Sequence, residues 1–410
     1  MTGASLTRRL ARTLRRPVCV EDRQRARIHL LDWMGCVAGA SDAPVAAHIP
    51  MQEDALERAS WLGNVLEMDD IHRMSILHPG PVIWPAALSR PGCSLEQALD
   101  AAISGYQAMI AVGCCFDARH YAFYHTTATA GVFGAAVAAA MLNGADEDAL
   151  TSAMGLAGSM SGGLWRMRHE DCDAKQFHVA RAAANGMAAA AAALSGVRGP
   201  EYILEGEQGL FAATCANPRP MPLEDRWTIH DVSIKPWAAC RHAHPSIDAA
   251  LRLREQGPLD GPIEVRTYAD AIRFCDRPDP VTVLDAKFSL QHAVALIAER
   301  GAVQLDDFGP EAIRALAPVR ARISVVEDPA LSAAYPEHYG ASIRCGGRSA
   351  VVMDTLGDPD NPLDDAGCIA KFAALARWGG CDDPLIDAGL SAALEGDDIR
   401  AIHDWLGNLA

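Results

Sequence analysis

Apolar residues recur every three or four positions through most of the first half of the chain, which is the spacing of helices that bury one face. The pattern predicts helices over residues 24–38, 95–115, 131–142 and 175–194, each with Gly or Pro near its ends. Their many Ala and Gly residues allow neighbouring helices to approach closely. No strand pattern is evident before about residue 225.

The pattern changes at residues 217–222, where three prolines break any helix and mark a boundary. Beyond it, alternating or β-branched runs predict strands over residues 263–268, 321–326 and 342–353. Residues 284–298 and 310–316 return to helical spacing, and so does the tail. The fold class is therefore mainly α with a smaller α+β domain. We expect residues 1–224 to form the first part of a helical domain, 225–363 the α+β domain, and 364–410 a helical tail that packs back on the first domain.

The composition argues against two functional classes, nucleic-acid-binding proteins and membrane proteins. The 410 residues include 36 Lys and Arg against 52 Asp and Glu, a formal charge of −16 that would repel nucleic acid and anionic membranes. The apolar stretches 128–142 and 182–194 fall short of the roughly 20 residues that a bilayer requires. We therefore expect neither a nucleic-acid partner nor a membrane.

Two further features bear on the compartment. The arginine-rich start lacks a continuous apolar stretch and a small-residue cleavage site, so we expect an ordinary first helix there. The 12 cysteines are scattered, with no CxxC pair, which is typical of buried thiols in a reducing compartment. Both features favour a cytoplasmic protein.

Two segments near the middle of the first half gather ionisable residues. In residues 66–80, Asp69 and Asp70 lie beside His72 and shortly before His78, so that a carboxylate can orient an imidazole; helix capping is the alternative. In residues 121–134, His125 precedes an Ala-rich helix whose free N–H groups favour a bound anion. Capping by the neighbouring threonines is compatible with that second interpretation.

Two more polar segments follow. In residues 164–181, Lys175 stands where an apolar helix begins, and desolvation there can bring its pKa into the range of a useful base; an exposed lysine is the alternative. In residues 234–246, Lys235, Arg241, His242 and His244 form a cationic group that favours a small carboxylate or phosphate. His242 and His244 also have a separation seen in metal sites, so a metal hydrolase stays open. The sequence has no GxGxxG after a strand, no Walker motif, no GxSxG and no HExxH, so nucleotide-dependent enzymes and serine hydrolases lose support.

Taken together and in this order, the four segments resemble the MmgE/PrpD family, which includes 2-methylcitrate dehydratase, cis-aconitate decarboxylase and iminodisuccinate epimerase. The likeness extends across nearly the whole chain. The other matching stretches are residues 30–36, 202–207, 277–280 and 286–290.

The resemblance implies a cofactor-free homodimeric enzyme with a large all-helical domain built from both chain ends, a smaller α+β lid domain, and an active site between the domains. It also implies functional positions. His78, His125 and Lys175 match positions where the family keeps catalytic or substrate-contacting groups, and Lys235 and His244 fall in its second cluster. The chain departs from the family pattern at four places, which argue against a decarboxylase: Glu67, Ile71, Cys240 and Phe274.

The shared chemistry begins with removal of a proton next to a carboxylate of a small di- or tricarboxylic acid, which requires a positioned base and cations that stabilise the developing charge. We expect Lys175 and His125 to transfer the proton, and His78, positioned by Asp69 or Asp70, to act as the acid for a leaving group. No metal or cofactor is expected. The expected substrate-binding residues are Asp70, Arg166, Lys235, Cys240, Arg241 and His244.

The outcome after proton removal stays open. Loss of a β-hydroxyl gives dehydration, return of a proton on the opposite face gives epimerisation, and loss of carbon dioxide gives decarboxylation. We rank a dehydratase-type lyase first, an epimerase second and a decarboxylase third. A carboxylate-binding protein without catalysis is the alternative from another class.

Overall fold

The computed structural model describes residues 3–50, 54–170 and 172–409, and the chain divides into two compact units. The helical unit comprises Met1–Val65, Asp69–Val232 and Asp364–Ala410, and the mixed unit comprises Leu66–Met68 and Ser233–Leu363. The sequence placed the boundaries at 224/225 and 363/364. The units change over between Val232 and Ser233 and between Leu363 and Asp364, and the assignment of residues 66–68 to the mixed unit was not anticipated.

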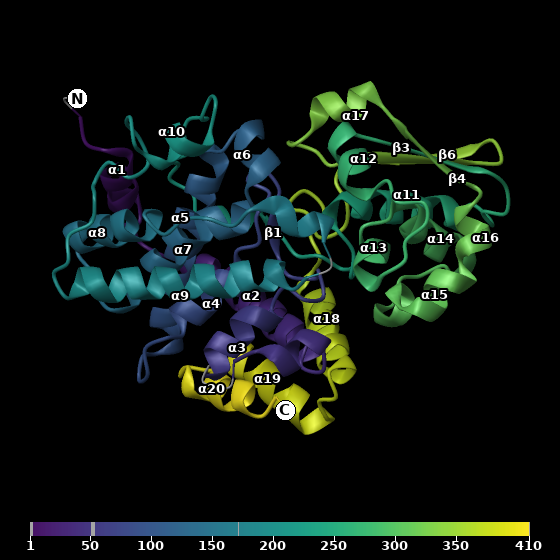
Figure 1. Ribbon diagram of the computed structural model, residues 1–410. Helices are drawn as coiled ribbons and strands as arrows, with labels where there is room; N and C mark the ends of the chain where they lie inside the picture. The colour runs from purple at the N-terminus through teal and green to yellow at the C-terminus, as the bar shows by residue number, and fades with distance from the viewer. Residues whose placement is uncertain (1–2, 51–53, 171, 410) are drawn as a thin grey trace. The chain divides into compact units, whose positions relative to one another are not determined.

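The helical unit contains both ends of the described chain (Figure 1). Its helices are α1 (Leu6–Thr13), α2 (Val20–Gly39), α3 (Ala55–Leu62), α4 (Gly80–Ala87), α5 (Leu95–Cys115), α6 (Ala118–Phe123), α7 (Thr126–Leu142), α8 (Glu147–Gly158), α9 (Ala174–Leu194), α10 (Leu210–Thr214), α18 (Asp365–Trp378), α19 (Asp383–Leu394) and α20 (Arg400–Gly407). Short 3₁₀ helices cover η1 (Pro44–His48), η2 (Trp165–His169) and η3 (Thr228–Asp231), and β1 (Ile71–His72) is a two-residue strand.

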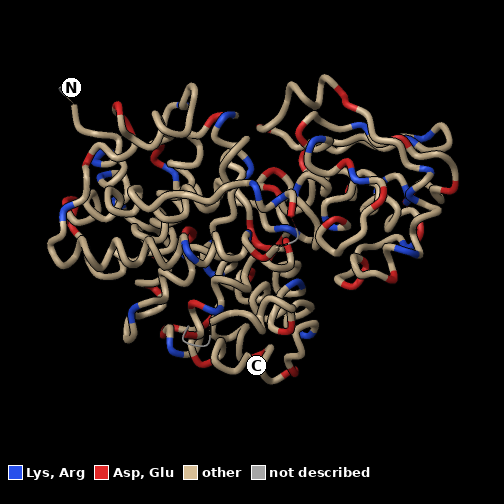
Figure 2. The backbone as a smooth tube through the Cα atoms, in the orientation of Figure 1, with Lys and Arg blue, Asp and Glu red and all other residues tan. Residues whose placement is uncertain are grey.

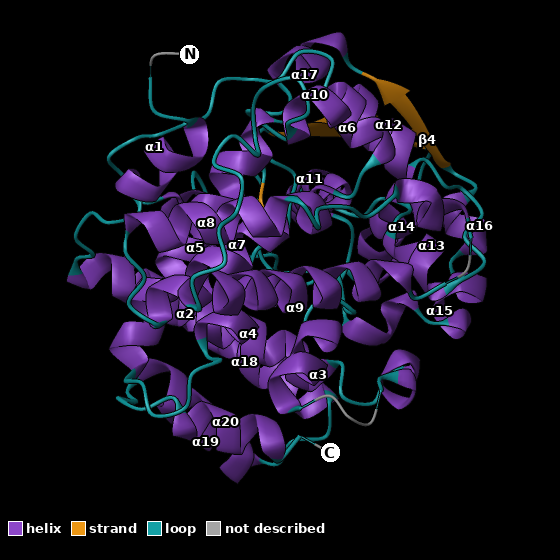
Figure 3. Ribbon diagram, turned by 60° about the vertical axis from the view of Figure 1, so that its left-hand side comes forward, coloured by secondary structure: helices purple, strands orange, loops and turns teal. Residues whose placement is uncertain are grey.

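The helices α5 and α9 both pack against α7, which is buried along nearly its whole length (Figures 1 and 3). Small residues set their spacing. A Cβ atom on Gly134 of α7 would stand 2.8 Å from the carbonyl oxygen of Gly105 on α5, and one on Gly186 of α9 would stand 2.7 Å from the carbonyl oxygen of Val132 on α7. The Ala- and Gly-rich composition thus allows backbone-to-backbone contact at both helix pairs.

The tail packs on the second helix of the chain. The backbone of Phe372 in α18 lies 3.2 Å from where a Cβ atom on Gly35 of α2 would stand. Lys371 of α18 donates to the Asp32 carboxylate at 2.5 Å, and both side chains are buried. The helical unit is therefore completed by residues from the two ends of the sequence.

One helix in the described part of the chain, α5, is long and apolar enough to cross a membrane by length and composition. Of its apolar window, 89% is buried inside the protein. Packing among the other helices accounts for that apolar surface.

The mixed unit is built on a four-stranded sheet of order β4-β3-β5-β6, in which β3 and β4 are parallel and the other pairs antiparallel. The strands are β3 (Ile263–Thr267), β4 (Ile323–Glu327), β5 (Ala341–Cys345) and β6 (Arg348–Val352); β2 (Val232–Ser233) lies where the units change over. The helices are α11 (His244–Glu255), α12 (Ala269–Cys275), α13 (Val283–Lys287), α14 (Leu290–Arg300), α15 (Pro310–Ala315), α16 (Ala317–Arg320) and α17 (Pro329–Ala334), with 3₁₀ turns η4 (Arg241–Ala243) and η5 (Leu305–Phe308). Alternation along β3 buries Ile263 and Val265 and leaves Glu264 and Arg266 partly exposed, as expected for a sheet covered on one face.

Two elements predicted as continuous are interrupted. The run 342–353 is a hairpin, because Gly346 and Gly347 both adopt positive φ and reverse the chain between β5 and β6. The run 284–298 is two helices, because Ser289 caps a new helix by accepting from the backbone of His292. Basic and acidic residues are scattered through both units rather than gathered in one segment (Figure 2).

Candidate functional site

The helical unit places an imidazole against one carboxylate of the acidic pair. Nδ1 of His78 lies 2.8 Å from Oδ2 of Asp69, and Asp69 is buried. The backbone N–H of His78 donates to Oγ1 of Thr127 at 3.1 Å, so the loop is tied to the first turn of α7. Because a carboxylate oxygen accepts, Nδ1 of His78 carries the proton and Nε2 is the atom left for other chemistry.

The second carboxylate, Asp70, is enclosed by three donors. It accepts from Tyr106 at 2.7 Å, from Nδ1 of His29 at 2.8 Å and from the backbone N–H of Gly80 at 2.8 Å. Burial raises the pKa of Asp70 to about 6 and holds the pKa of His29 well below its usual range, so the contact is a neutral imidazole on a carboxylate rather than an ion pair at neutral pH. A Cβ atom on Gly80 would stand 2.8 Å from Asp70, and therefore glycine is required there.

The two imidazoles that the sequence placed near the acidic pair thus have different surroundings. His72 is turned to Oγ of Ser75 at 2.7 Å, and burial lowers its pKa to about 3. His78 is the one held by Asp69. The sequence alone could not choose between Asp69 and Asp70 because both precede His78 at similar spacing.

His125 caps the N-terminus of α7 and is buried. Its backbone N–H donates to the carbonyl of Gly163 at 2.9 Å, whereas neither ring nitrogen has a hydrogen-bond partner among the described residues. Burial, followed by the nearby charges of Lys175, His178 and His78, holds the pKa of His125 well below its usual range. The ring is therefore neutral at pH 7 and offers one basic nitrogen.

Lys175 lies in the first turn of α9 and is partly buried. One turn later, His178 has its ring centroid 5.7 Å from that of His125, and its Nδ1 has no hydrogen-bond partner in the described part of the chain. The Trp165 ring covers His125 at 4.7 Å. Lys175, His178, His78 and Asp69 all influence His125 electrostatically, so three segments of the helical unit, far apart in sequence, supply one cluster.

Arg166 is placed differently from the rest of this set. Its side chain is 74% exposed, and its Nε donates to Glu170 at 2.5 Å, one helical turn away. It therefore stands at the surface of η2 with a carboxylate neighbour of its own.

In the mixed unit, Lys235 is almost completely buried, and its Nζ lies 3.9 Å from Oε2 of Glu67. Glu67 is itself buried and adopts a φ of 59°, which is rare for a residue with a side chain. A buried lysine requires a compensating charge, and Glu67 supplies one.

Arg241 of the same unit is held by a buried carboxylate. Its Nη2 donates to both oxygens of Asp358, which also accepts from Oγ of Ser233 at 2.7 Å. The guanidinium lies 4.9 Å from the centre of the Tyr339 ring. Nη1 is buried and has no hydrogen-bond partner within the described ranges, so it is the donor that remains for an anionic group.

His244 and Cys240 are also buried in the mixed unit. Nε2 of His244 donates to the carbonyl of Ala239 at 3.1 Å, which fixes the tautomer of the ring. The backbone N–H of Cys240 donates to the backbone carbonyl of Lys287. The Cys240 thiol is hydrogen-bonded to Cys275, and the pKa of Cys275 is held well above its usual range, mainly by burial.

His242, one of the two histidines behind the metal-hydrolase alternative, is engaged with aromatic residues of the mixed unit. Nδ1 of His242 forms a hydrogen bond of 2.6 Å with the Tyr268 hydroxyl. The His242 ring stacks on the Phe274 ring, with the ring centres 5.2 Å apart. Burial lowers its pKa to about 3. The described residues contain no group of three His, Cys, Asp or Glu side chains that could hold a metal ion. His242 instead belongs to an aromatic cluster completed by Tyr335 and Tyr339.

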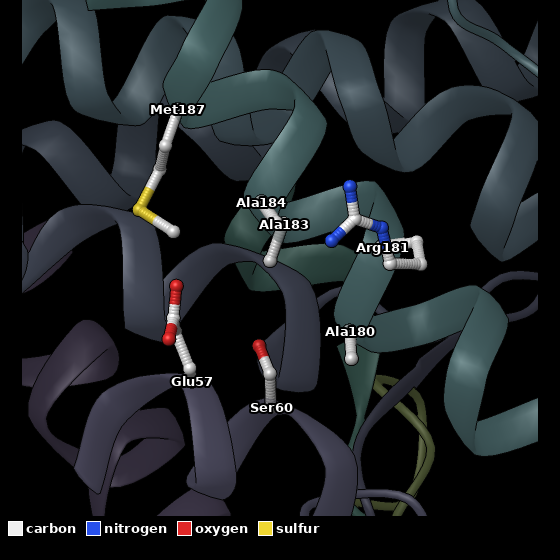
Figure 4. Close-up of a pocket in the computed structure, with 7 residues that line it drawn as sticks. All are labelled: Glu57, Ser60, Ala180, Arg181, Ala183, Ala184 and Met187. Carbon is white, nitrogen blue, oxygen red and sulfur yellow. The ribbon is translucent and has the colours of Figure 1, made fainter. Parts of the chain in front are cut away.

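A separate small cavity lies between α3 and α9, lined by Glu57, Ser60, Arg181, Met187 and alanines of α9 (Figure 4). Its volume of about 20 Å³ is enough for about one water molecule. It is therefore too small for a metabolite.

Family models identify both parts of the chain. The MmgE/PrpD N-terminal domain matches residues 49–222, and the MmgE/PrpD C-terminal domain matches residues 237–383. The chain belongs to the MmgE/PrpD family. Among its relatives is the cis-aconitate decarboxylase of Homo sapiens, 26% identical over 198 residues, which are 45% of this chain and 40% of the human protein.

A second relative covers more of the sequence. The cis-aconitate decarboxylase-like protein oryM of Aspergillus oryzae is 23% identical over 352 residues, which are 71% of this chain and 72% of that protein. The match to the human decarboxylase thus spans less than half of that protein, whereas the match to the fungal one spans most of both chains.

Sequence reasoning overlooked several partners of the predicted residues: Asn64, which donates to Asp69; His29 and Tyr106, which hold Asp70; and Asp358, which holds Arg241. Each is far from its partner in sequence or lies in a segment without a motif. A signal was present only for Asn64, a polar residue after the apolar end of a short helix.

Proposed function

We propose that this protein is a cofactor-independent lyase that removes a proton next to a carboxylate of a small di- or tricarboxylic acid and then expels a β-hydroxyl as water. The observation that carries the proposal is the cluster of Asp69, His78, His125 and Lys175 in the helical unit. It combines a neutral buried imidazole, a lysine and an imidazole held by a carboxylate, which are the parts that base and acid catalysis require.

In the proposed reaction, the pair His125 and Lys175 takes the α-proton. The electron pair left on the α-carbon forms the double bond as the C–O bond to the β-hydroxyl breaks. His78, protonated on both ring nitrogens, gives the proton on Nε2 to the departing oxygen, so that water leaves and the neutral Nδ1–H tautomer remains. Asp69 stabilises the charged imidazole between turnovers.

The cationic groups of the mixed unit are proposed to bind the substrate carboxylates. Lys235, Nη1 of Arg241 and His244 are buried cationic or polar groups; Lys235 lies 3.9 Å from Glu67, and Arg241 is paired with Asp358. We also propose substrate contacts from Cys240, Asp70 and Arg166. Arg166 is exposed and Asp70 already accepts from three donors, so we expect these two residues to contribute less to substrate binding than the buried cations.

Proton-exchange spectroscopy tests this proposal. The purified protein is incubated in deuterated water with C4 to C7 hydroxy di- and tricarboxylic acids, and products are followed by proton and carbon NMR. A lyase gives an alkene, with solvent deuterium at the α-carbon of recovered substrate. If none of these acids exchanges or reacts, while one of them still binds, the protein is a carboxylate-binding homologue without catalysis.

Decarboxylation is the second candidate, because one relative is named cis-aconitate decarboxylase and the other cis-aconitate decarboxylase-like protein. Cis-aconitate in the same experiment separates the two outcomes. Decarboxylation releases carbon dioxide and puts one solvent deuteron on the carbon that lost it, whereas a dehydratase acting in reverse adds water across the double bond. An epimerase would exchange the α-proton and give neither product.

We further propose that the protein works as a cytoplasmic homodimer. Light scattering on the purified protein checks the assembly and should return about twice the chain mass of 43.6 kDa. A mass near that of one chain at micromolar concentration would contradict it.

A further inference from the structure

Asp69 receives a second side chain in addition to His78. Nδ2 of Asn64 donates to Oδ2 of Asp69 at 2.7 Å, and this is the same oxygen that contacts Nδ1 of His78 at 2.8 Å. The amide nitrogen also lies 3.4 Å from Nδ1 of His78. Asn64 therefore contacts both members of the pair.

The local fold gives Asn64 little freedom. It follows the end of α3 at Leu62, where the chain turns through a hydrogen bond from the backbone of Val65 to the carbonyl of Leu62. A Cβ atom on the preceding Gly63 would stand 2.9 Å from the Trp33 indole, so the turn is packed tightly. Asn64 itself has no exposed surface.

The hydrogen bonding of Asn64 is one-sided. Its amide nitrogen is used, whereas its amide oxygen is buried with no partner among the residues that the structure describes. A buried amide that served only to tie the fold together would use both ends. This one supplies a donor at a single point, the carboxylate oxygen that orients His78.

We propose that Asn64 is a positioning residue that fixes the orientation and the tautomer of His78 through Asp69. With two N–H donors converging on one oxygen, the Asp69 carboxylate is held as an acceptor and its plane cannot rotate away from the imidazole. Nδ1 of His78 then keeps its proton, and Nε2 faces the reaction. This role rests on the proposed function, in which His78 is the acid for the leaving group.

The test uses Asn64→Asp, which has nearly the same shape but no N–H donor, and Asn64→Leu, which removes the donor without adding charge. In both variants turnover should fall by about tenfold to hundredfold with little change in KM, since a misplaced group costs rate rather than affinity. Nitrogen-15 NMR of the His78 ring, with no substrate present, should show loss of the single Nδ1–H tautomer. Asn64→Ser, which keeps a donor, should recover part of the rate.

Asn143→Leu is the matched control. Asn143 is an exposed amide at the C-cap of α7 that donates to the carbonyl of Ala139, so its loss should lower the melting temperature slightly and leave the His78 tautomer alone. Unchanged His78 spectra in Asn64→Asp and Asn64→Leu would overturn the proposal, and so would losses of rate that only follow the melting temperature. A wild-type protein inactive on every acid, with the His78 tautomer still controlled by Asn64, would reject the proposed function and support the positioning role.

Discussion

At the scale of single residues, the candidate chemistry depends on ionisable side chains that are buried next to other charged or ionisable groups. His125 is neutral because it is buried near Lys175, and Asp69 is a buried carboxylate beside an imidazole. The types of these residues could be predicted from the sequence. Their pairing could not, because neighbouring carboxylates at positions 69 and 70 turn to different partners.

Lys175→Ala tests the base. Turnover should fall by about a hundredfold or more, the usual contribution of a positioned acid or base, with circular dichroism unchanged. Arg181→Ala, an exposed cation two turns further along α9, is the control and should keep wild-type turnover. Retention of more than about a tenth of the rate by Lys175→Ala would assign proton removal elsewhere.

Asp69→Asn tests the orientation of His78. The amide cannot stabilise a charged imidazole, so kcat should fall about a hundredfold while KM changes little. Steady-state kinetics measures both constants. Asp146→Asn, which alters an N-cap of α8 at the surface, is the control. A rise in KM with unchanged kcat would instead make Asp69 a group that binds the substrate.

Asp70→Asn tests a dependence of stability on pH. Because burial raises the pKa of Asp70 from 3.8 to about 6, its contribution to stability is fully present below about pH 4 and is lost as the pH rises through about 6. The loss is on the order of 2–3 kcal/mol. Urea unfolding between pH 4.5 and about pH 7.5 should show a decline in wild type that is absent in the variant.

The control for that experiment is Asp387→Asn, which changes an exposed carboxylate of α19. It should keep the wild-type decline. A decline of equal size in Asp70→Asn would mean that another buried carboxylate is responsible.

At the scale of elements, the helices of the first half could be predicted from long apolar segments that end near Gly and Pro, although α5 and α7 are buried on nearly all sides rather than on one face. The predicted limits of the helix at residues 95–115 agree with those of α5, and α9 begins one residue before the predicted start. The interruptions in the mixed unit could not be predicted in the same way. A glycine pair or a capping serine changes the direction of the chain without altering the hydrophobic pattern.

Gly134→Ala tests the contact between α5 and α7. The new methyl group would meet the Gly105 carbonyl at 2.8 Å and the Met109 side chain at 2.7 Å, so the helices must separate. We expect a loss of about 1–3 kcal/mol in the free energy of unfolding, measured by urea denaturation. Gly407→Ala in α20, where a Cβ atom meets nothing within 4 Å, should be neutral or stabilise by up to about 1 kcal/mol.

At the scale of the whole molecule, the helical unit is assembled from distant parts of the sequence. The helical tail was predicted from its period, but the ion pair between Asp32 and Lys371 was not, because the two residues are 339 positions apart. The assignment of residues 66–68 to the mixed unit could not be predicted either, because a segment of three residues is too short to show a hydrophobic period.

Lys371→Met tests the join between α2 and α18. It leaves the buried Asp32 without its cation and should cost about 3–5 kcal/mol, whereas the double variant Asp32→Leu with Lys371→Met should recover most of that loss. Arg377→Ala removes an exposed ion pair of the same helix with Asp383, so it should cost less than about 1 kcal/mol. Equal effects of Lys371→Met and Arg377→Ala in thermal melts would show that the join is held by other contacts.

The join between α2 and α18 also has a consequence for biosynthesis. Asp32 and Lys371 are 339 positions apart, so a ribosome adding about 5–20 residues per second needs roughly 17–70 s to deliver the second after the first. During that interval the nascent α2 has an aspartate and an apolar strip that no other part of the chain has yet covered. Helix α18 therefore covers its face of α2 only after the intervening residues have been made, and that face stays open to chaperones for the whole interval.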